Sequence, residues 1–373
     1  MLTLTGETII DTIGQQINLI LNKMEVKITM LNVKDGDAII IELQKTDKKL
    51  VMVVDGGELG YYKTKMKPKL ESILKSHDKK APDIVVCTHY DSDHIGGLIP
   101  LIEDYVSDIK EVWVHKTPEL LKGYIEKAIH LTEQKEKFVG DFALSNFKKL
   151  FENYQSPSKQ LLDEKADLLI ESLPQLKRLI DLIPASKLKQ VFYNQKPLTD
   201  WQEITVLGPT KSYYDSLFPN TKTFEQFILE EALESLPSGK AELRLSEMAG
   251  IKPCDTLKED AETKLTSTNK ASIIFAIDKA DKRYLFTGDA GIESFKSIPE
   301  WKTELKNLYF LKIPHHASDN NISKELIELM QPEYAYNTGY KYQDDAVLKC
   351  LSEKQRNKEV KTTKTDDDLY FDK

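Results

Sequence analysis

The spacing of apolar residues changes several times along the chain, and each change marks a predicted element. Over residues 7–21 the apolar positions recur at helical spacing, which predicts an amphipathic helix within an N-terminal segment, 1–23. From Val26 the period becomes two, and apolar runs at 38–43 and 50–54, separated by turn residues, predict short strands. The chain therefore begins with a helix and continues into a sheet.

Helices and strands then alternate, which is typical of α/β proteins. Helices are predicted near 67–77 and 95–106, and the later strands are predicted at 83–87, 111–114, 203–207, 272–277, 284–287 and 308–313. Two stretches interrupt this alternation, a charged helical insertion at 117–202 and a polar insertion at 211–268. The predicted domain thus has a first half, a core strand and a second half, at 24–116, 203–210 and 269–373.

Composition places the chain among globular proteins. With 373 residues, 40% of them hydrophobic and 30% charged, it is long enough to bury a full core. No apolar run reaches the about 18 residues that a membrane span requires, and no basic residue precedes an apolar N-terminal stretch. We therefore expect a cytoplasmic location without a membrane partner. The three scattered cysteines, Cys87, Cys254 and Cys350, suggest no disulfide framework, and we expect them to be reduced.

The charged residues suggest a possible function in only one segment of the sequence. A formal net charge of −8 argues against a general nucleic-acid coat protein, because neutralising phosphates requires lysines and arginines gathered on one face. One basic segment, which we call the lysine tract, lies ahead of the strand at 83–87; it comprises Lys63, Lys65, Lys67, Lys69, Lys75, Lys79 and Lys80. The tract is either a solvated helix face or a contact for nucleic acid.

The strongest chemical signal directly follows the strand at 83–87. His89, Asp91, Asp93 and His94 lie within six residues and are followed by Gly96-Gly97, which permits a tight turn into the next helix. Gathering two carboxylates and two imidazoles at a strand end costs several kcal/mol unless a cation holds them together. Nitrogen and oxygen ligands without thiolates suit zinc, manganese or iron. The motif therefore predicts a two-metal site.

Residues far along the chain are expected to complete that site. Asp289 follows the strand at 284–287 and could bridge two ions, which in such sites lie about 3.5 to 4 Å apart. His315 follows the strand at 308–313 and is the preferred remaining ligand. Because adjacent side chains leaving a strand point in opposite directions, we expect only one of His315 and His316 to ligate, and His316 to act catalytically instead.

These motifs resemble those of the metallo-β-lactamase fold hydrolases, and most closely the metallo-β-lactamase domain of the competence protein ComEC. The chain carries HxDxDHxGG, with Asp91 where the usual signature has a second histidine. Val54-Asp55-Gly56-Gly57, Thr287-Gly288-Asp289 and the stretch from Lys312 to Ser318 are similar to segments of that branch, and Val360–Phe371 resembles its terminal hairpin. The resemblance implies an αββα sandwich of two mixed sheets flanked by helices, carrying a helical insertion.

Three departures from the resemblance concern the site. No histidine lies between His130 and His315, so the usual third-motif ligand is missing. Ala317 stands where the branch has glycine, a small change if its φ is negative. The stretch 340–345 lacks an expected histidine-proline pair, which removes a candidate general acid. We therefore expect one metal centre with four ligands, Asp93, His94, Asp289 and His315, and a leaner centre with fewer ligands, His89 and Asp91.

The function predicted from these observations is hydrolysis by a metal-activated water, with two divalent ions, zinc first and manganese or magnesium as alternatives. Asp93 and His94 are predicted to act in catalysis as well as in ligation. The resemblance and the lysine tract favour a phosphodiesterase or nuclease with a nucleic-acid or nucleotide substrate. The alternatives are a hydrolase of a small ester, lactone or amide, and a catalytically weakened scaffold whose 117–202 helices bind a protein partner.

Three further residues are candidates for binding the substrate. Lys312 could face a phosphate or serve the structure, and its apolar neighbours favour the structural role. Ser318 could bond a substrate oxygen or cap the following helix, of which the cap is preferred. Asn269 could contact the substrate or supplement the leaner metal centre.

Overall fold

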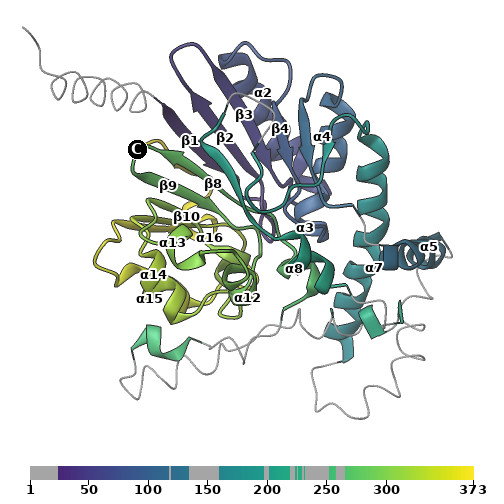
Figure 1. The fold of residues 1–373 in the computed structure, drawn as a ribbon. Coiled ribbons are helices and arrows are strands. Elements are labelled where there is room, and N and C mark those ends of the chain that lie inside the picture. The colour runs from purple at the N-terminus through teal and green to yellow at the C-terminus, as the bar shows by residue number, and fades with distance from the viewer. Residues whose placement is uncertain are drawn as a thin grey trace, which may run out of the picture.

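The computed structural model describes residues 24–116, 119–133, 159–196, 201–218, 223–224, 226–228, 231, 252–257 and 265–373. The helix predicted within 1–23 lies outside these residues. Two sheets pack face to face, and helices cover their outer faces (Figure 1). The structure therefore has the α/β architecture that the alternation of apolar runs and amphipathic segments predicts.

The first sheet has seven strands in the order β13-β1-β2-β3-β4-β5-β6. The first three strands of the chain are antiparallel neighbours, and the strands from β3 to β6 run parallel to one another. The bounds are β1 (Glu25–Met30), β2 (Ile39–Gln44), β3 (Lys49–Val54), β4 (Ile84–Val86), β5 (Glu111–Trp113), β6 (Leu188–Lys189) and β13 (Leu369–Phe371). Strand β6 lies within the stretch expected to be a helical insertion, so that part of the stretch belongs to the sheet.

The second sheet has six strands in the order β12-β11-β10-β9-β8-β7. Strands β7 to β9 are antiparallel, with the β8–β9 hairpin at its predicted place, and strands β9 to β12 are parallel. The bounds are β7 (Ile204–Gly208), β8 (Ile274–Lys279), β9 (Lys282–Phe286), β10 (Phe310–Lys312), β11 (Tyr334–Asn337) and β12 (Glu359–Thr362). In both sheets the parallel strands end toward the loops that carry the predicted site.

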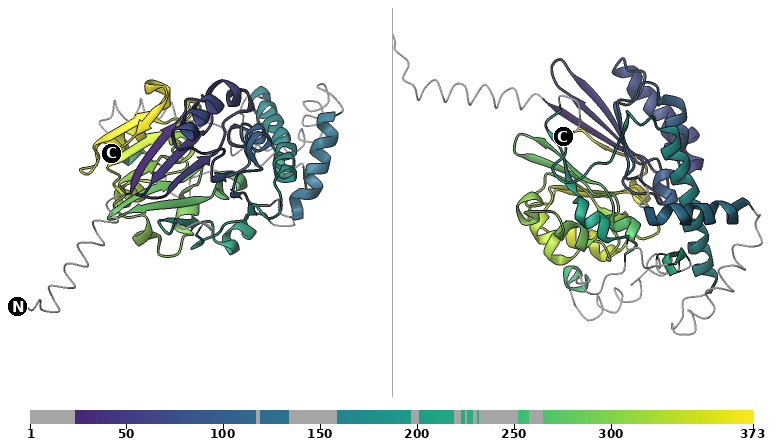
Figure 2. Two further views of the ribbon diagram at one scale, coloured as in Figure 1. Left: turned by 90° about the horizontal axis from the view of Figure 1, so that it is seen from above. Right: turned by 45° about the vertical axis from the view of Figure 1, so that its right-hand side comes forward.

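Burial divides the helices into two outer layers (Figure 2). The layer on the first sheet includes α2 (Lys67–Ser76), α3 (Ser92–Ile95), α4 (Leu98–Tyr105), α5 (Glu119–Glu133) and α7 (Lys159–Leu182). The second sheet is covered mainly by α12 (Ile292–Lys296), α13 (Trp301–Glu304), α14 (Lys324–Met330) and α15 (Asp345–Ser352). Aromatic side chains from both sheets, among them Trp113, Phe275, Phe310 and Phe371, fill the space between them. Burial of this apolar surface holds the layers together.

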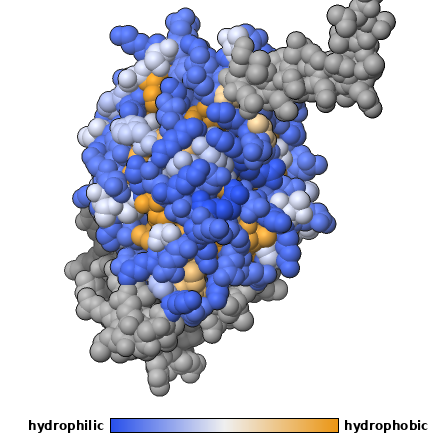
Figure 3. Space-filling view, turned by 90° about the vertical axis from the view of Figure 1, so that its left-hand side faces the viewer, coloured by the Kyte–Doolittle hydropathy of each residue, from blue (hydrophilic) through white to orange (hydrophobic). Residues whose placement is uncertain are grey.

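Shorter elements connect these layers. The described ones are the turns at Leu59–Tyr61, Tyr62–Met66, Pro253–Thr256 and Pro314–Ala317 and the helices α8 (Lys211–Ser216), α11 (Ser267–Lys270) and α16 (Thr363–Asp366). The face of the molecule in Figure 3 is mainly hydrophilic, with apolar side chains in small separate groups. In the part of the chain that the structure describes, no helix is both long and apolar enough to cross a membrane.

The end of the chain differs from the predicted hairpin. Strand β12 pairs in parallel with β11 in the second sheet, whereas β13 pairs antiparallel with β1 in the first. Helix α16 connects them, so the two strands belong to different sheets. The hairpin was predicted from the resemblance, and it was wrong because the local sequence does not reveal which sheet edge each short strand joins.

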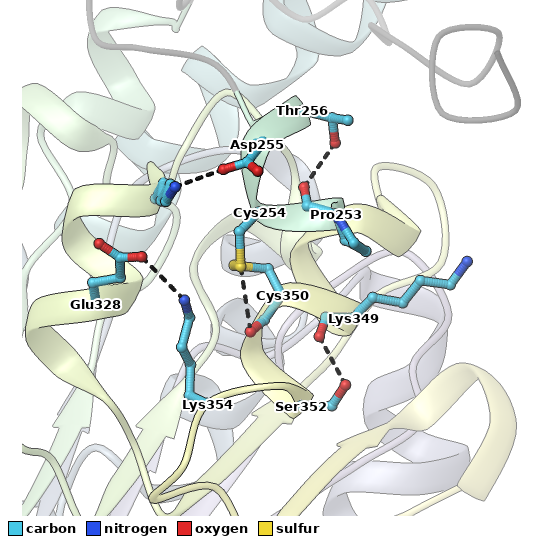
Figure 4. The surroundings of a disulfide bond; sticks show 10 residues. Pro253, Cys254, Asp255, Thr256, Glu328, Lys349, Cys350, Ser352 and Lys354 are labelled. Atoms are coloured by element: carbon cyan, nitrogen blue, oxygen red, sulfur yellow. Dashed lines mark hydrogen bonds and ion pairs between the residues drawn. A yellow bond between two sulfur atoms is a disulfide. The ribbon is translucent and has the colours of Figure 1, made fainter. Parts of the chain in front are cut away.

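The expectation of three reduced cysteines was also wrong. Cys254 and Cys350 form a disulfide that spans 96 residues and joins the turn at Pro253–Thr256 to α15, and only Cys87 is free (Figure 4). Their Cα atoms lie 4.8 Å apart, within the usual range for a disulfide. Spacing in the sequence could not show this, because the fold brings the two segments together.

Candidate metal centre

The candidate centre lies where loops from both sheets meet. The loop after β4 carries His89 to His94, the loop after β9 carries Asp289, and the turn after β10 carries His315 and His316. Parallel strands of a sheet present their carboxyl ends at the same edge, where α/β proteins commonly place their sites. Close backbone packing supports the first loop, since a Cβ on Gly97 would lie 2.0 Å from the carbonyl oxygen of Gly56.

Four imidazoles converge on one carboxylate oxygen. The Nε2 atoms of the four histidines lie 3.3 to 3.9 Å from Oδ2 of Asp289; they belong to His89, His94, His315 and His316. His94 and His316 are fully buried, and Asp289 is only 2% exposed. Asp289 is therefore the common centre of the arrangement, as expected of a residue that bridges two ions.

The opposite nitrogen of each ring is bound by the protein. Nδ1 of His94 lies 2.8 Å from Oδ2 of Asp55, which can only accept when ionised, so the ring carries its proton on Nδ1. Nδ1 of His316 donates to the carbonyl oxygen of Thr338 at 3.0 Å. These bonds leave each Nε2 lone pair directed toward Asp289, the tautomer that a metal ligand requires.

The other two rings are held in the same way. The Thr88 hydroxyl donates to Asp55 at 2.6 Å and can therefore accept from Nδ1 of His89 at 3.0 Å. Nδ1 of His315 lies 2.8 Å from Oδ1 of Asn321, whose amide nitrogen donates to the carbonyl oxygen of Asp289. All four imidazoles therefore present Nε2 to the centre.

Unpartnered buried atoms test whether the residues fit a metal. Nε2 of three histidines and one carboxylate oxygen each of two aspartates have no hydrogen-bond partner among the described residues; the residues are His89, His94, His316, Asp91 and Asp289. Buried polar atoms without partners cost about 1–3 kcal/mol each. Their convergence, with nitrogen and carboxylate donors alternating, fits divalent cations.

Charges at the site are strongly coupled. Burial acts to lower the pKa of His94, but the carboxylates of Asp289, Asp55 and Asp93 outweigh it and hold the pKa well above its usual value. Burial likewise opposes the shift of Asp93, whose pKa is nevertheless lowered because His94 and His316 lie beside it. Protonated imidazoles therefore balance the carboxylates without a metal, and a bound cation would replace those protons.

Asp91 behaves differently from Asp93. Burial, and after it the neighbouring charge of Asp93, raises the pKa of Asp91 to about 7. Its Oδ2 lies 3.7 Å from Nε2 of His89, a ring whose pKa burial lowers to about 3. A neutral imidazole thus balances little of the Asp91 charge, so without a metal this carboxyl is only partly ionised near pH 7.

Among the residues that the structure describes, two groups are close enough to hold an ion. One comprises His89, His94 and Asp289, and the other Asp37, His94 and His316. The donors of the first group meet at Asp289, the residue that two ions would share. The second group is unsuited, because Asp37 already has two partners: the buried ammonium of Lys312 pairs with it, and the Thr338 hydroxyl donates to it. Asp37 therefore supports the site and is not positioned as a ligand.

The structure brings together the metal ligands predicted from the sequence, which are His89, Asp91, Asp93, His94, Asp289 and His315. His316, assigned a catalytic role, reaches as far in: its Nε2 lies 3.6 Å from both Asp93 and Asp289. Alternation along a strand does not apply here, because β10 ends at Lys312 and both histidines have positive φ, 42° and 54°. Both rings can therefore turn inward.

Ala317 extends this strained turn. Its φ is 67°, so the condition for a harmless replacement of glycine is not met. Three successive residues with side chains hold left-handed backbone, at about 1–2 kcal/mol each. Such strain persists where the surrounding structure holds the turn in place, as it does at functional sites.

The three residues predicted to bind the substrate are all buried. Lys312 is 1% exposed and donates to the carbonyl oxygen of Gly288 at 3.1 Å, which agrees with a structural role. Ser318 does not cap the next helix, since Ser323 is the N-cap of α14. Asn269 is 3% exposed, and its Oδ1 lacks a hydrogen-bond partner among the described residues.

Several contributing residues were not predicted as site residues. Asp37, Asp55, Thr88, Asn321 and Thr338 hold the ligands, and the ring of Tyr342 lies 4.7 Å from that of His315. Asp55 could have been identified from the sequence, because it directly follows a predicted buried strand. The others are ordinary polar residues whose function depends on contacts between distant segments.

Most of the lysine tract is already paired. Lys65 lies near Asp367 and Asp368, Lys67 pairs with Asp104, and Lys79 pairs with Asp83. The Lys69 ammonium lies 4.3 Å from the centre of the Tyr370 ring. The tract is therefore largely a solvated, paired surface and gives little support to nucleic-acid binding.

Comparison with known proteins found a family model that matches part of the chain and solved structures that are similar to it. Residues 31–141 match the family model described as the Metallo-beta-lactamase superfamily. The metallo-beta-lactamase fold protein YhfI from Bacillus subtilis is similar at 11% sequence identity and a TM-score of 0.39, over 94% of this chain and 100% of that one. No curated protein matches the chain. With the family match and two mixed sheets flanked by helices, the chain has a metallo-β-lactamase fold, whose superfamily consists mostly of metal-dependent hydrolases.

Proposed function

We propose that this protein is a metal-dependent phosphodiesterase or nuclease that hydrolyses a phosphodiester of nucleic acid or of a nucleotide. The observation that carries the proposal is the convergence of four Nε2 atoms on Asp289, with unpartnered carboxylate oxygens of Asp91 and Asp289 beside them. Such a set of donors suits two divalent cations and offers no thiol or seryl nucleophile. Attack by an activated water is the chemistry that this arrangement favours.

The ligands divide around Asp289. Asp93, His94 and the pair of His315 and His316 would hold one ion, and His89 with Asp91 would hold the other. Two such ions supply a water activated at neutral pH and neutralise charge on the attacked group. Asp93 can orient that water, since its side chain is 23% exposed and reaches toward solvent.

The oxygen content of the site favours a phosphodiester over a carboxylic ester. Asp91 takes the place of an imidazole, so carboxylates outnumber nitrogens on the His89 side. Oxygen ligands favour manganese and magnesium over zinc, and paired ions of this kind stabilise both the attacking and the leaving oxygen at phosphorus. The resemblance of the motifs to those of the ComEC-like branch supports the same substrate class.

A metal and substrate screen tests the proposal. Purified protein would be loaded with manganese, magnesium or zinc and assayed on single-stranded DNA, RNA, cyclic dinucleotides, bis(p-nitrophenyl) phosphate and a lactone. We expect manganese-dependent hydrolysis of phosphodiesters, lost in Asp289→Asn and retained in Asp345→Asn, an exposed carboxylate outside the centre. Hydrolysis of the lactone alone would overturn the substrate class. If the purified protein bound no metal and cleaved none of these substrates, the proposal that it is an enzyme would be wrong.

A further inference from the structure

We propose that Lys34 and Lys341 bind a phosphate that neighbours the scissile phosphate in a nucleic-acid strand. This inference rests on the proposed phosphodiester hydrolysis and narrows its substrate to a strand with a further phosphate beside the cleaved one. Lys34 lies in the loop between β1 and β2, and Lys341 lies in the loop between β11 and α15. Neither residue belongs to the lysine tract.

The loop that carries Lys34 packs against the metal-binding motif. A Cβ on Gly36 would lie 2.1 Å from the carbonyl oxygen of Asp93, so the two backbones are in close contact. Lys34 is two residues from this contact, and its side chain is exposed. The Lys34 side chain therefore begins close to the Asp93 side of the centre and extends into solvent.

The loop that carries Lys341 is joined both to the centre and to the first loop. The ring of Tyr342 lies 4.7 Å from that of His315. The side-chain amide of Asn32, in the first loop, donates to the Tyr340 hydroxyl at 2.7 Å. Lys341 lies between these two contacts and is exposed. The two lysines therefore lie on adjacent loops beside the centre.

Both ammonium groups act on one carboxyl next to the motif. Burial, and after it the charges of Asp93 and Asp35, raises the pKa of Glu58. The charges of Lys341 and Lys34 oppose this rise. Since exposed charges are largely screened from one another beyond about 10 Å, both ammonium groups lie near this carboxyl and near the Asp93 side of the centre. A phosphate that enters beside Asp93 would meet both of them.

The two lysines differ from the lysine tract in their ionic partners. Lys65, Lys67 and Lys79 form ion pairs with carboxylates. Within the part of the chain that the structure describes, neither Lys34 nor Lys341 forms an ion pair. A lysine ammonium carries three donors and binds phosphate as a point charge, so both groups are available to the oxygens of a strand.

The backbone of Lys34 supports a function for its side chain. Its φ is 59°, in the left-handed region that glycine adopts readily and that strains a residue with a Cβ. The backbone N–H of Lys34 donates to Oδ1 of Asn32 at 3.2 Å, which helps to hold this turn. Such strain is common at binding and catalytic sites. A lysine where glycine would fit with less strain therefore indicates that the ammonium is used.

Binding of a strand at several salt concentrations tests the inference. Manganese-loaded protein would be titrated into a fluorescent oligothymidylate of about eight nucleotides, whose phosphorothioate linkages slow its cleavage. Lys34→Gln and Lys341→Gln should each weaken binding about three- to fivefold, as for the loss of one exposed ion pair. The slope of log affinity against log salt concentration should fall by about 0.7 for each lysine removed, the value for one phosphate of a single strand.

Two further variants serve as controls. Lys306→Gln removes an exposed lysine that precedes β10, at the opposite end of that strand from the centre, and should change neither the affinity nor the slope. Lys34→Gly should weaken binding as much as Lys34→Gln and yet not lower the melting temperature, because glycine relieves the left-handed backbone. A loss of affinity in this variant therefore cannot come from misfolding.

Kinetics on two substrates distinguish the lysines from the metal centre. On an unmodified oligonucleotide, both glutamine variants should raise KM about three- to fivefold and leave kcat unchanged, since they remove binding that the ground state and the transition state share. On bis(p-nitrophenyl) phosphate, which has a single phosphate, kcat/KM should stay unchanged. A fall in kcat/KM on this small substrate would assign the lysines to the centre itself and overturn the inference.

The remaining outcomes separate the inference from the proposed function. Unchanged strand affinity and salt slope in both glutamine variants would overturn the inference, and cleavage of bis(p-nitrophenyl) phosphate would then leave the proposed function standing. An equal loss in Lys306→Gln would show general electrostatic attraction and would overturn it as well. If the protein binds the strand through these lysines but cleaves no phosphodiester, the proposed function fails, while the phosphate contact is supported.

Discussion

The two sides of the candidate metal centre differ in the residues that hydrogen-bond to their imidazoles. On the His94 side, the ring donates to a buried carboxylate, Asp55, and Asp93 lies 3.6 Å from Nε2 of His316. On the His89 side, the ring is held by the hydroxyl of Thr88, and Asp91 has an oxygen without a partner among the described residues. The sequence offers no third-motif histidine to this second side.

The residues that hold each imidazole should set the metal affinity of its side of the centre. A carboxylate behind an imidazole fixes its tautomer and raises its basicity, whereas a hydroxyl fixes the tautomer with less effect on charge. The pKa of Asp93 is lowered by His94 and His316 despite burial, while burial raises that of Asp91 to about 7. We therefore expect the His94 side to bind its ion more tightly.

The largest effect should come from the residue shared by both sides. Asp289→Asn removes the charge on which all four imidazoles converge, so neither ion should be retained. Losing several kcal/mol of transition-state stabilisation corresponds to a fall in kcat/KM of roughly a thousandfold or more. Elemental analysis measures the metal content, and steady-state kinetics measures kcat/KM. Retention of two ions would show that Asp289 does not bridge the sides.

The next effect compares the two aspartates of the motif. Asp93→Asn should weaken binding of the tighter ion on the order of 100-fold, and Asp91→Asn should weaken only the second ion, since each loses one charged ligand. Stepwise calorimetric titration with manganese resolves the two events. If both variants affected the same event equally, the asymmetry proposed for the centre would be incorrect.

A smaller effect is expected from the hydroxyl behind His89. Thr88→Val removes the acceptor of the His89 Nδ1 proton while keeping the shape of the side chain. Outer-shell changes of this kind typically cost 10- to 100-fold in metal affinity, and we expect about tenfold here, confined to the second ion. The same titration measures it. Unchanged binding would mean that Thr88 serves Asp55 alone.

The smallest effect concerns stability without metal. The folded-state pKa of Asp91 is raised to about 7 from an ordinary value of 3.8, so ionisation destabilises the fold as pH rises from about 4 to 7. Asp91→Asn should therefore raise the free energy of unfolding of metal-free protein by about 1 kcal/mol at pH 8, less than the full shift because the side chain is 23% exposed.

Chemical denaturation at pH 8 and at pH 4 checks this last expectation. The stabilisation should be largely absent at pH 4, where the Asp91 carboxyl is mostly protonated in the folded protein. With metal present the sign should reverse, because the variant loses a ligand. Equal stabilisation at both pH values would indicate a cause other than the charge of Asp91.

Local patterns predicted much of the fold. Helix α2 and strands β4, β8 and β9 lie close to their predicted ranges, because apolar periodicity depends on neighbours a few residues away. The same holds for the cluster from His89 to His94, whose members share one loop. By contrast, the separation of β12 and β13 into different sheets was mispredicted, since pairing partners are chosen over long distances.

Short runs of residues were sufficient to predict an α/β protein with a metal-binding motif after its fourth strand, because apolar periodicity and the motif are local features. The convergence of four imidazoles on Asp289, the contact of Asp55 with His94 and the contact of the Tyr342 ring with His315 were visible only in the folded structure. The disulfide between Cys254 and Cys350 belongs with these. Each depends on contacts between distant segments, and burial of the shared core selects those contacts.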